Sequence, residues 1–327
     1  MKISKNKYIK LEKMSNEFGI IGALAIDQRG SIKKMIGNYK ENVTNLDIEE
    51  YKKLISKNLT PFASSILLDP EYGLPASRIR NKDCGLLLAY EKTGYDATKI
   101  GRLPDILDDW SVKRLKQEGA DAIKFLLYYD IDSSDEINHL KHVFIERLGS
   151  ECYGEDIPFF LEIVTYSESD VTGIEYAKQR PYKIIDAMKE FSKEKYKVDV
   201  LKVEIPVDMN YVEGYSKNEI AYSKNEAKKF YKLQSDATDL PYIFLSGGVS
   251  MDLFKKSLLL AKESGAKFNG VLCGRATWKD SIEPFAKDGI DACENFLNEE
   301  CKKNISSLNE VLNVSATSFK YKLDLSE

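Results

Sequence analysis

Eight short apolar segments, most of them separated by amphipathic helical patterns, constrain the fold of this chain more than any other feature. They are rich in Leu, Ile and Val and carry few polar residues, which is typical of strands buried on both faces of a parallel sheet. The segments lie at residues 20–26, 65–68, 85–90, 122–128, 159–165, 198–205, 242–245 and 269–273. This alternation predicts an α/β fold, a TIM (β/α)8 barrel with helical extensions at its N- and C-termini.

Helical patterns fill most of the intervals between the apolar segments. They lie at residues 47–59, 111–118, 134–148, 181–195, 223–236, 252–265, 287–301 and 307–319. The segment 69–75, between the second and third predicted strands, is expected to be a loop with little helix. A doubly wound open sheet is the alternative fold, but no G-x-G-x-x-G turn follows the first strand, which disfavours it. Because no low-complexity linker interrupts the pattern, residues 1–327 are expected to form a single domain.

Local signals mark several helix ends. Ser223 is followed three residues later by Glu226, a capping box that predicts the start of a helix. Pro181 suits the first turn of a helix. Gly119 and Gly265 are expected to terminate helices as C-caps.

Three consecutive predicted strands, the fourth, fifth and sixth, each carry a charged residue that is costly to bury: Lys124, Glu162 and Lys202. Alternation along a strand places Glu204 on the same face as Lys202. Strands four and six contribute to the same layer of a barrel interior, so the two lysines are expected to face each other with Glu162 between them. A desolvated lysine beside a like charge attacks carbonyls, which predicts an amine active site. A structural ion network, with Lys202 paired to Glu204 and Lys124 to Glu162, is the alternative.

The ends of the first, seventh and eighth strands carry residues suited to binding a sugar phosphate. Small residues let backbone N–H groups approach a phosphate, and the loops after strands seven and eight form the usual phosphate pocket of such barrels. These loops contain Ser246, Gly247 and Gly248, and Gly274 and Arg275. Asp27 and Gln28 follow the first strand, where Asp27 is suited to bonding substrate hydroxyls and Arg29 to reaching a second phosphate. A plain turn is the alternative for each loop.

Composition narrows the classes of function. Lys and Arg number 48 against 52 Asp and Glu, a net charge of −4, which argues against a nucleic-acid partner. Five cysteines without a C-x-x-C pair predict free thiols in a reducing cytoplasm. The N-terminus lacks a secretory apolar region, and no apolar segment has the length of a membrane span. His139 and His142 are the only histidines; both are expected on the solvent side of a helix, so no multi-histidine zinc site is predicted.

Six longer strings resemble a known family, the class I (Schiff-base) tagatose 1,6-bisphosphate aldolases of the bacterial tagatose-6-phosphate pathway, which degrades lactose and galactose. The strings lie at residues 25–30, 64–76, 81–91, 124–130, 201–204 and 268–278. The similarity extends from about Ile21 to Phe319 and therefore covers nearly the whole chain. Some relatives have Ser-Ala-Gly where this chain has Ser246-Gly247-Gly248, a difference of little consequence where backbone groups contact the phosphate.

The resemblance implies a role for each candidate residue. Lys202 forms the Schiff base, Glu162 is the general acid/base and Lys124 is its charged neighbour. The residues implied to hold the carbon-1 phosphate are Ser246, Gly247, Gly274 and Arg275, with Gly248 in the same loop. Asp27 and Gln28 contact hydroxyl groups, and Arg29 serves the carbon-6 phosphate. The resemblance also implies a cytoplasmic, metal-independent enzyme without a cofactor, a sugar bisphosphate as its partner, and a homo-oligomer.

Two other functions remain open from the sequence. A related aldolase acting on another ketose phosphate, such as a sulfonated sugar phosphate, would keep the lysine and change the contacts at the far end of the substrate. A non-catalytic protein that senses sugar phosphates would use the same pocket without turnover. Tagatose and fructose 1,6-bisphosphates differ only at carbon 4, and a loose site there would accept both.

Overall fold

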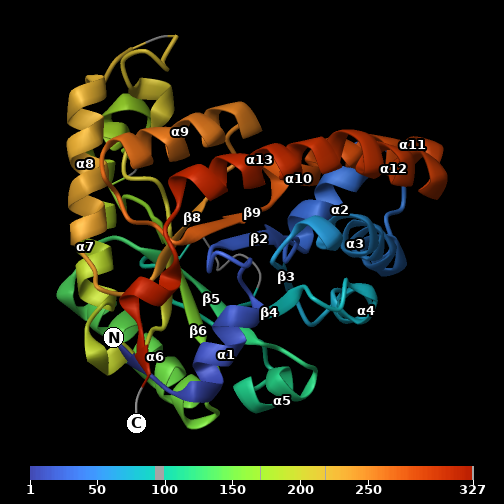
Figure 1. The fold of residues 1–327 in the computed structure, drawn as a ribbon, viewed down its shortest axis with the longest axis horizontal. Helices are drawn as coiled ribbons and strands as arrows, with labels where there is room; N and C mark the ends of the chain where they lie inside the picture. Colours follow the sequence, from blue (N-terminus) through green and yellow to red (C-terminus); the bar gives the residue numbers. More distant parts are fainter. Residues whose placement is uncertain (93–98, 170, 218, 326–327) are drawn as a thin grey trace.

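Eight parallel strands close into a barrel in this computed structural model, which describes residues 1–92, 99–169, 171–217 and 219–325 (Figure 1). The strands are β2 (Ile21–Ala25), β3 (Ser65–Leu68), β4 (Gly85–Ala89), β5 (Ala122–Tyr129), β6 (Phe159–Thr165), β7 (Val200–Val203), β8 (Tyr242–Leu245) and β9 (Gly270–Cys273). Each strand pairs with the next along the chain, and β9 pairs with β2 to close the ring. The predicted (β/α)8 barrel is confirmed, and the open sheet is wrong.

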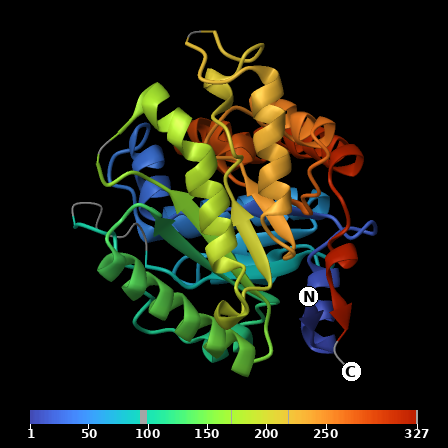
Figure 2. The same ribbon diagram turned by 90° about the vertical axis from the view of Figure 1, so that its left-hand side faces the viewer.

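Helices surround the barrel on the outside (Figure 2). They are α2 (Gly30–Gly37), α3 (Asn45–Leu59), α4 (Leu74–Ile79), α5 (Val112–Gln117), α6 (Asp135–Gly154), α7 (Gly173–Phe191), α8 (Lys224–Asp236), α9 (Met251–Glu263), α10 (Arg275–Trp278), α11 (Ile282–Asp288), α12 (Ile290–Phe296) and α13 (Lys302–Ser315). Short 3-10 helices lie at Thr60–Phe62, Glu194–Tyr196, Met209–Tyr211, Lys279–Ser281 and Phe319–Lys322, and a π-helical turn at Leu297–Cys301. The main apolar core lies between strands and helices. The last helices pack on the chain itself, α12 against α3 and α13 against α9.

The local signals predicted some helix ends correctly and others wrongly. The capping box of Ser223 and Glu226 begins α8, and Gly119 and Gly265 follow α5 and α9 with positive φ. Pro181, however, lies inside α7, which begins at Gly173. An interior proline cannot donate the backbone hydrogen bond of its turn, yet α7 continues past Pro181 to Phe191.

The C-terminal helical pattern is divided where the sequence predicted one helix over 287–301. Gly289 has a φ of 91°, a conformation that L side chains rarely adopt, and it separates α11 from α12. α6 also extends to Gly154, beyond the predicted end at residue 148. The predicted loop at residues 69–75 leads into the short helix α4. Of these differences, the break between α11 and α12 is explained by the positive φ of Gly289.

The N-terminal helix α1 (Lys5–Lys13) closes the end of the barrel where the strands begin. Leu11 and Met14 belong to the same apolar cluster as inward-facing strand residues such as Phe160. Lys7 pairs with Asp199 at 2.8 Å, which ties the helix to the start of β7. The short strands β1 (Lys2–Ile3) and β10 (Asp324–Leu325) pair with each other, so the two ends of the chain meet there (Figure 1).

Two further expectations concern the whole chain. All five cysteines are free, as predicted, and the structure shows that all five are buried. Within the described ranges, no helix combines the length and the apolarity that a membrane span needs.

Replacing Leu11 with Ala tests the role of α1 as the closure of the barrel. Leu11 is fully buried, so its truncation should lower the free energy of unfolding by about 2–5 kcal/mol, measured by urea denaturation. Ile9→Ala on the same helix is the control, because Ile9 is 51% exposed and its loss should cost at most about 0.5 kcal/mol. Equal effects of the two substitutions would mean that α1 does not pack as described.

Candidate active site

Two lysines and one glutamate meet inside the barrel. Lys202 Nζ on β7 lies 2.7 Å from Glu162 Oε1 on β6, and Lys124 Nζ on β5 lies 2.7 Å from Glu162 Oε2. All three residues are buried. Because β6 lies between β5 and β7, Glu162 bridges both lysines, and the structure brings these candidates together as expected.

Lys202 does not pair with Glu204, and that interpretation of the sequence was wrong. β7 ends at Val203, so the alternation of faces does not extend to Glu204. Its carboxylate instead accepts hydrogen bonds from the backbone N–H and the hydroxyl of Thr165, each at 2.8 Å, and lies 3.3 Å from Arg180. The amine of Lys202 therefore pairs with Glu162 instead.

Lys124 is surrounded by carboxylates. Its Nζ lies 2.9 Å from Asp27 Oδ2 and 2.6 Å from Glu91 Oε1, in addition to Glu162. Burial opposes the charged form of Lys124, but the attraction of the three carboxylates outweighs it and raises its pKa well above the ordinary value. Lys124 is therefore a fixed cation that no longer acts as a free amine.

The same contacts keep the carboxylates ionised. Burial would raise the pKa values of Asp27 and Glu162, but the charges of Lys124 and Lys202 outweigh burial and lower both. Glu162 is thus held as an anion between Lys124 and Lys202, at hydrogen-bonding distance from the amine of Lys202.

Glu91 is a member of this cluster that sequence reasoning missed. Its second oxygen, Oε2, accepts a hydrogen bond from the backbone N–H of Leu126 at 3.2 Å, and its carbonyl accepts one from Arg29 Nη2 at 2.7 Å. It stands two residues beyond β4, as Asp27 stands two residues beyond β2. The signal in the sequence that could have identified Glu91 is its position just after an apolar strand.

The loops after β8 and β9 adjoin each other. Gly247 and Gly248 have φ values of 60° and 81°, and a Cβ on Gly248 would lie 3.4 Å from Nη2 of Arg275. A Cβ on Gly274 would lie 3.2 Å from the carbonyl oxygen of Ala25. These glycines therefore allow backbone and guanidinium to approach each other closely, and the buried Ser246 begins the same turn. The sequence grouped these residues correctly.

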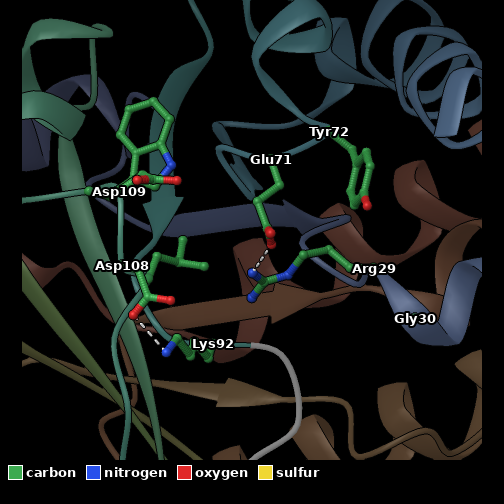
Figure 3. A pocket seen from close by; sticks show the side chains of 9 residues that line it. Arg29, Gly30, Glu71, Tyr72, Lys92, Asp108 and Asp109 are labelled. Carbon is green, nitrogen blue, oxygen red and sulfur yellow. Dashed lines mark hydrogen bonds and ion pairs between the residues drawn. The ribbon is translucent and has the colours of Figure 1, made fainter.

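Gln28 and Arg29 point to different places. A Cβ on Gly274 would lie 3.5 Å from Nε2 of Gln28, so this amide borders the glycine loops. Its Oε1 is buried without a hydrogen-bond partner. Arg29 turns away toward Glu71, its ion-pair partner (Figure 3). Arg29 and Glu71 line a pocket of about 440 Å³. Its other lining residues are Gly30, Tyr72, Lys92, Leu107, Asp108, Asp109 and Trp110.

The two histidines are not alike, contrary to the prediction that both face solvent. His139 is exposed, but His142 is half-buried, with Nε2 2.9 Å from the Tyr129 hydroxyl and its ring against Phe191 and Tyr196. Burial lowers the pKa of His142. In the described part of the chain, no group of three or more His, Cys, Asp or Glu side chains is arranged to hold a metal ion.

Comparison with known proteins identifies the family. A model of the DeoC/LacD family aldolases matches residues 21–280. The chain belongs to the DeoC/LacD aldolase family. It is 59% identical over 327 residues to tagatose 1,6-diphosphate aldolase 2 of Enterococcus faecalis, covering 99% of each chain. It is 55% identical over 323 residues to the tagatose 1,6-diphosphate aldolase of Streptococcus pneumoniae, covering 98% of this chain and 99% of the relative.

Solved structures agree on the fold of this DeoC/LacD aldolase. A fructose-bisphosphate aldolase from Plasmodium falciparum superimposes with a TM-score of 0.64 at 18% identity, covering 98% of this chain and 96% of the other. A Schiff-base-forming fructose-1,6-bisphosphate aldolase superimposes with a TM-score of 0.58 at 15% identity, covering 93% and 99%. For this lyase, the barrel interior offers one amine beside one carboxylate, the minimal pair for attack on a carbonyl.

Replacing Lys124 with Met should reverse the effect of pH on stability. In the native chain, the lowered pKa values of Asp27 and Glu162 contribute stability above about pH 4, the unfolded value, and this contribution is lost as pH falls. Without Lys124 the clustered carboxylates repel one another, their native pKa values rise, and stability is lost as pH rises. Urea unfolding should show a loss of about 3–5 kcal/mol at about pH 7 and a smaller one at about pH 5.

Lys124→Arg is the control for this substitution, because it keeps the positive charge. It should retain stability that rises with pH, as in the native chain. A loss for Lys124→Met that is the same at both pH values would show that packing, and not charge, explains the effect.

Proposed function

We propose that this chain is a class I aldolase that reversibly cleaves D-tagatose 1,6-bisphosphate to dihydroxyacetone phosphate and D-glyceraldehyde 3-phosphate, and that it accepts epimers at carbon 4 such as fructose 1,6-bisphosphate. The observation that carries this proposal is the 2.7 Å contact between the buried amine of Lys202 and Glu162. The names of the relatives, at 55–59% identity, support the choice of substrate.

Lys202 is the nucleophile of the proposed reaction. Its neutral amine attacks the carbon-2 ketone, and the carbinolamine loses water to form an iminium. The iminium accepts the electron pair of the bond between carbons 3 and 4 when that bond breaks, so the lysine supplies the electron sink and no metal or cofactor is required. The aldehyde leaves, the enamine is protonated at carbon 3, and water hydrolyses the imine to release dihydroxyacetone phosphate.

Glu162 is the general acid/base, and Lys124 is a positioning residue. Glu162 removes the proton of the carbon-4 hydroxyl during cleavage, because it is the carboxylate that adjoins the imine nitrogen. Lys124 holds the other oxygen of Glu162 at 2.7 Å and remains charged throughout.

The remaining candidates bind substrate. Ser246, Gly247, Gly248, Gly274 and Arg275 surround the carbon-1 phosphate, where the adjoining loops offer backbone N–H groups beside one guanidinium. Asp27 and Gln28 bond the hydroxyl groups, and the unpartnered Oε1 of Gln28 supports this role because a buried acceptor gains from a donor. Assembly as a homo-oligomer in the cytoplasm stays a prediction.

Borohydride reduction in the presence of dihydroxyacetone phosphate tests the proposal. The reduced adduct should map by peptide mass to Lys202, and Lys202→Met should abolish both the adduct and cleavage. Lys124 is the internal control: its raised pKa keeps it protonated, so its peptide should stay unmodified. Appreciable turnover by Lys202→Met, or an adduct elsewhere, would overturn the assignment.

Glu162→Gln should lower kcat by about 10²–10⁴-fold while KM changes little, because the amide keeps the shape but cannot accept a proton. Glu204→Gln is a matched control: both glutamates are buried at the same end of the barrel, but Glu204 contacts Thr165 and Arg180 instead of Lys202. Steady-state kinetics measure both variants. A defect confined to KM in Glu162→Gln would remove its acid/base role.

A further inference from the structure

The fully buried ion pair of Lys52 and Asp69 lies beside the group of charged residues around Lys124, and the proposed reaction does not use it. Lys52 Nζ on α3 lies 2.7 Å from Asp69 Oδ1 and donates to the carbonyl oxygen of Ile26 at 2.9 Å. Ile26 directly precedes Asp27, whose carboxylate lies 2.9 Å from Lys124 Nζ. The amine of Lys52 therefore holds the backbone from which Asp27 projects.

The two charges of this pair are costly to bury. Burial lowers the pKa of Lys52 and raises the pKa of Asp69, and in each case it outweighs the attraction of the partner. Around Lys124 the opposite holds, because three carboxylates outweigh burial there. A single buried ion pair commonly adds no stability over apolar residues of similar volume. The hydrogen bond from Lys52 to the loop after β2 is therefore the contact in which this pair differs from an apolar contact.

A second buried side chain holds the same stretch of backbone. Trp278, at the end of α10, donates its indole N–H to the carbonyl oxygen of Ala25 at 2.8 Å. Tyr51, the neighbour of Lys52 on α3, has its hydroxyl 3.2 Å from the carbonyl oxygen of Trp278. The two carbonyls that precede Asp27 thus each receive a buried donor, and both donors are tied to α3.

The Lys52–Asp69 pair is itself held at both ends. Lys52 lies on α3, which packs against α4, and the hydroxyl of Ser56 on α3 donates to the carbonyl of Ala76 on α4 at 2.8 Å. Asp69 Oδ2 receives the backbone N–H of Tyr72 at 3.1 Å. A donor fixed in this way defines the position of the group that it binds, as the supporting residues of an active site must do.

We propose that Lys52 is a positioning residue of the aldol cleavage: with Asp69 as its counter-ion, it holds the carbonyl of Ile26 and so directs the carboxylate of Asp27. This role rests on the proposed function, in which Asp27 binds hydroxyl groups of the substrate. Lys52 lies on a helix outside the barrel and acts on the reaction only through Asp27 (Figure 1).

The double variant Lys52→Met/Asp69→Asn tests this role without leaving a buried charge unpaired. Its kcat/KM for tagatose 1,6-bisphosphate should fall about tenfold to a hundredfold, because a small misplacement of a group that contacts the substrate has an effect of this size. Steady-state kinetics measure the loss, and urea unfolding establishes that the variant is folded under the conditions of the assay. An unchanged kcat/KM would overturn the proposal.

Lys7→Met/Asp199→Asn is the matched control. This pair is also buried, with its charged atoms 2.8 Å apart, and Asp199 Oδ2 also receives a backbone N–H, that of Phe159. It lies under α1 at the closed end of the barrel, so its removal should leave kcat/KM unchanged. Equal kinetic losses in this control and in Lys52→Met/Asp69→Asn would mean general destabilisation and would contradict a positioning role.

Removal of the Asp27 side chain separates positioning from structural support. If Lys52 acts through Asp27, adding Lys52→Met/Asp69→Asn to an Asp27→Ala chain should lower kcat/KM less than about twofold further, because interacting sites are not additive. A merely structural pair would cost the same factor in both backgrounds. The full loss in the Asp27→Ala chain would therefore refute the role of Lys52.

The Lys202 adduct distinguishes failure of this role from failure of the proposed function. Lys202 lies on β7, which is not adjacent to β2, so Lys52→Met/Asp69→Asn should still give the reduced adduct with dihydroxyacetone phosphate. Absence of the adduct from the native chain would overturn the proposed function. An adduct in both chains, together with an unchanged kcat/KM, would overturn the role of Lys52 alone.

Discussion

Charge compensation around Lys124 is the interaction on which the rest of the site depends. A lysine that is 1% exposed inside a barrel would lose its proton or unfold the protein if it stood alone. Asp27, Glu91 and Glu162 remove that cost; Asp27 and Glu91 lie just after β2 and β4, and Glu162 lies within β6. The three acidic groups therefore gather around Lys124, and one of them, Glu162, also faces Lys202.

The alternation of sign continues beyond this lysine. Lys202 pairs with Glu162, and Glu162 pairs with Lys124. Lys124 also pairs with Glu91, whose backbone carbonyl accepts a hydrogen bond from Arg29. Parallel strands make this possible because their carboxyl ends meet on one rim, so residues distant in sequence become neighbours. The closed apolar layer under α1 at the other end leaves the rim as the place where charges can be tolerated.

The sequence predicted the features whose signal lies within a single segment of the chain. All eight strands were found because each is a continuous apolar segment, and Lys124, Glu162 and Lys202 were found because each interrupts one. Glu91 was missed because it stands outside its strand, where acidic residues are common. The fully buried pair of Lys52 and Asp69 was missed for a similar reason: Lys52 lies on the amphipathic helix α3, and only the packing of that helix buries it.

The Lys52–Asp69 pair is a kind of contact that a sequence pattern cannot predict. Lys52 Nζ donates to the carbonyl oxygen of Ile26 at 2.9 Å and to Asp69 at 2.7 Å, and Asp69 receives the backbone N–H of Tyr72. One ion pair thus joins the loop that presents Asp27 to the loop that presents Glu71. Its existence depends on three elements meeting in space, so no period or motif within one element predicts it.

The contacts of Glu162 also bear on the timing of proton transfer in the proposed reaction. The charge of Lys202 is one of the causes that lower the pKa of Glu162, after that of Lys124. Cleavage of the carbon–carbon bond converts a positively charged iminium into a neutral enamine, so that lowering contribution disappears during this step. Glu162 therefore becomes more basic as the proton of the carbon-4 hydroxyl reaches it, while Lys124 keeps it in place. A carboxylate placed between the permanent cation Lys124 and the transient charge of the iminium is held in place and able to accept a proton when the bond breaks.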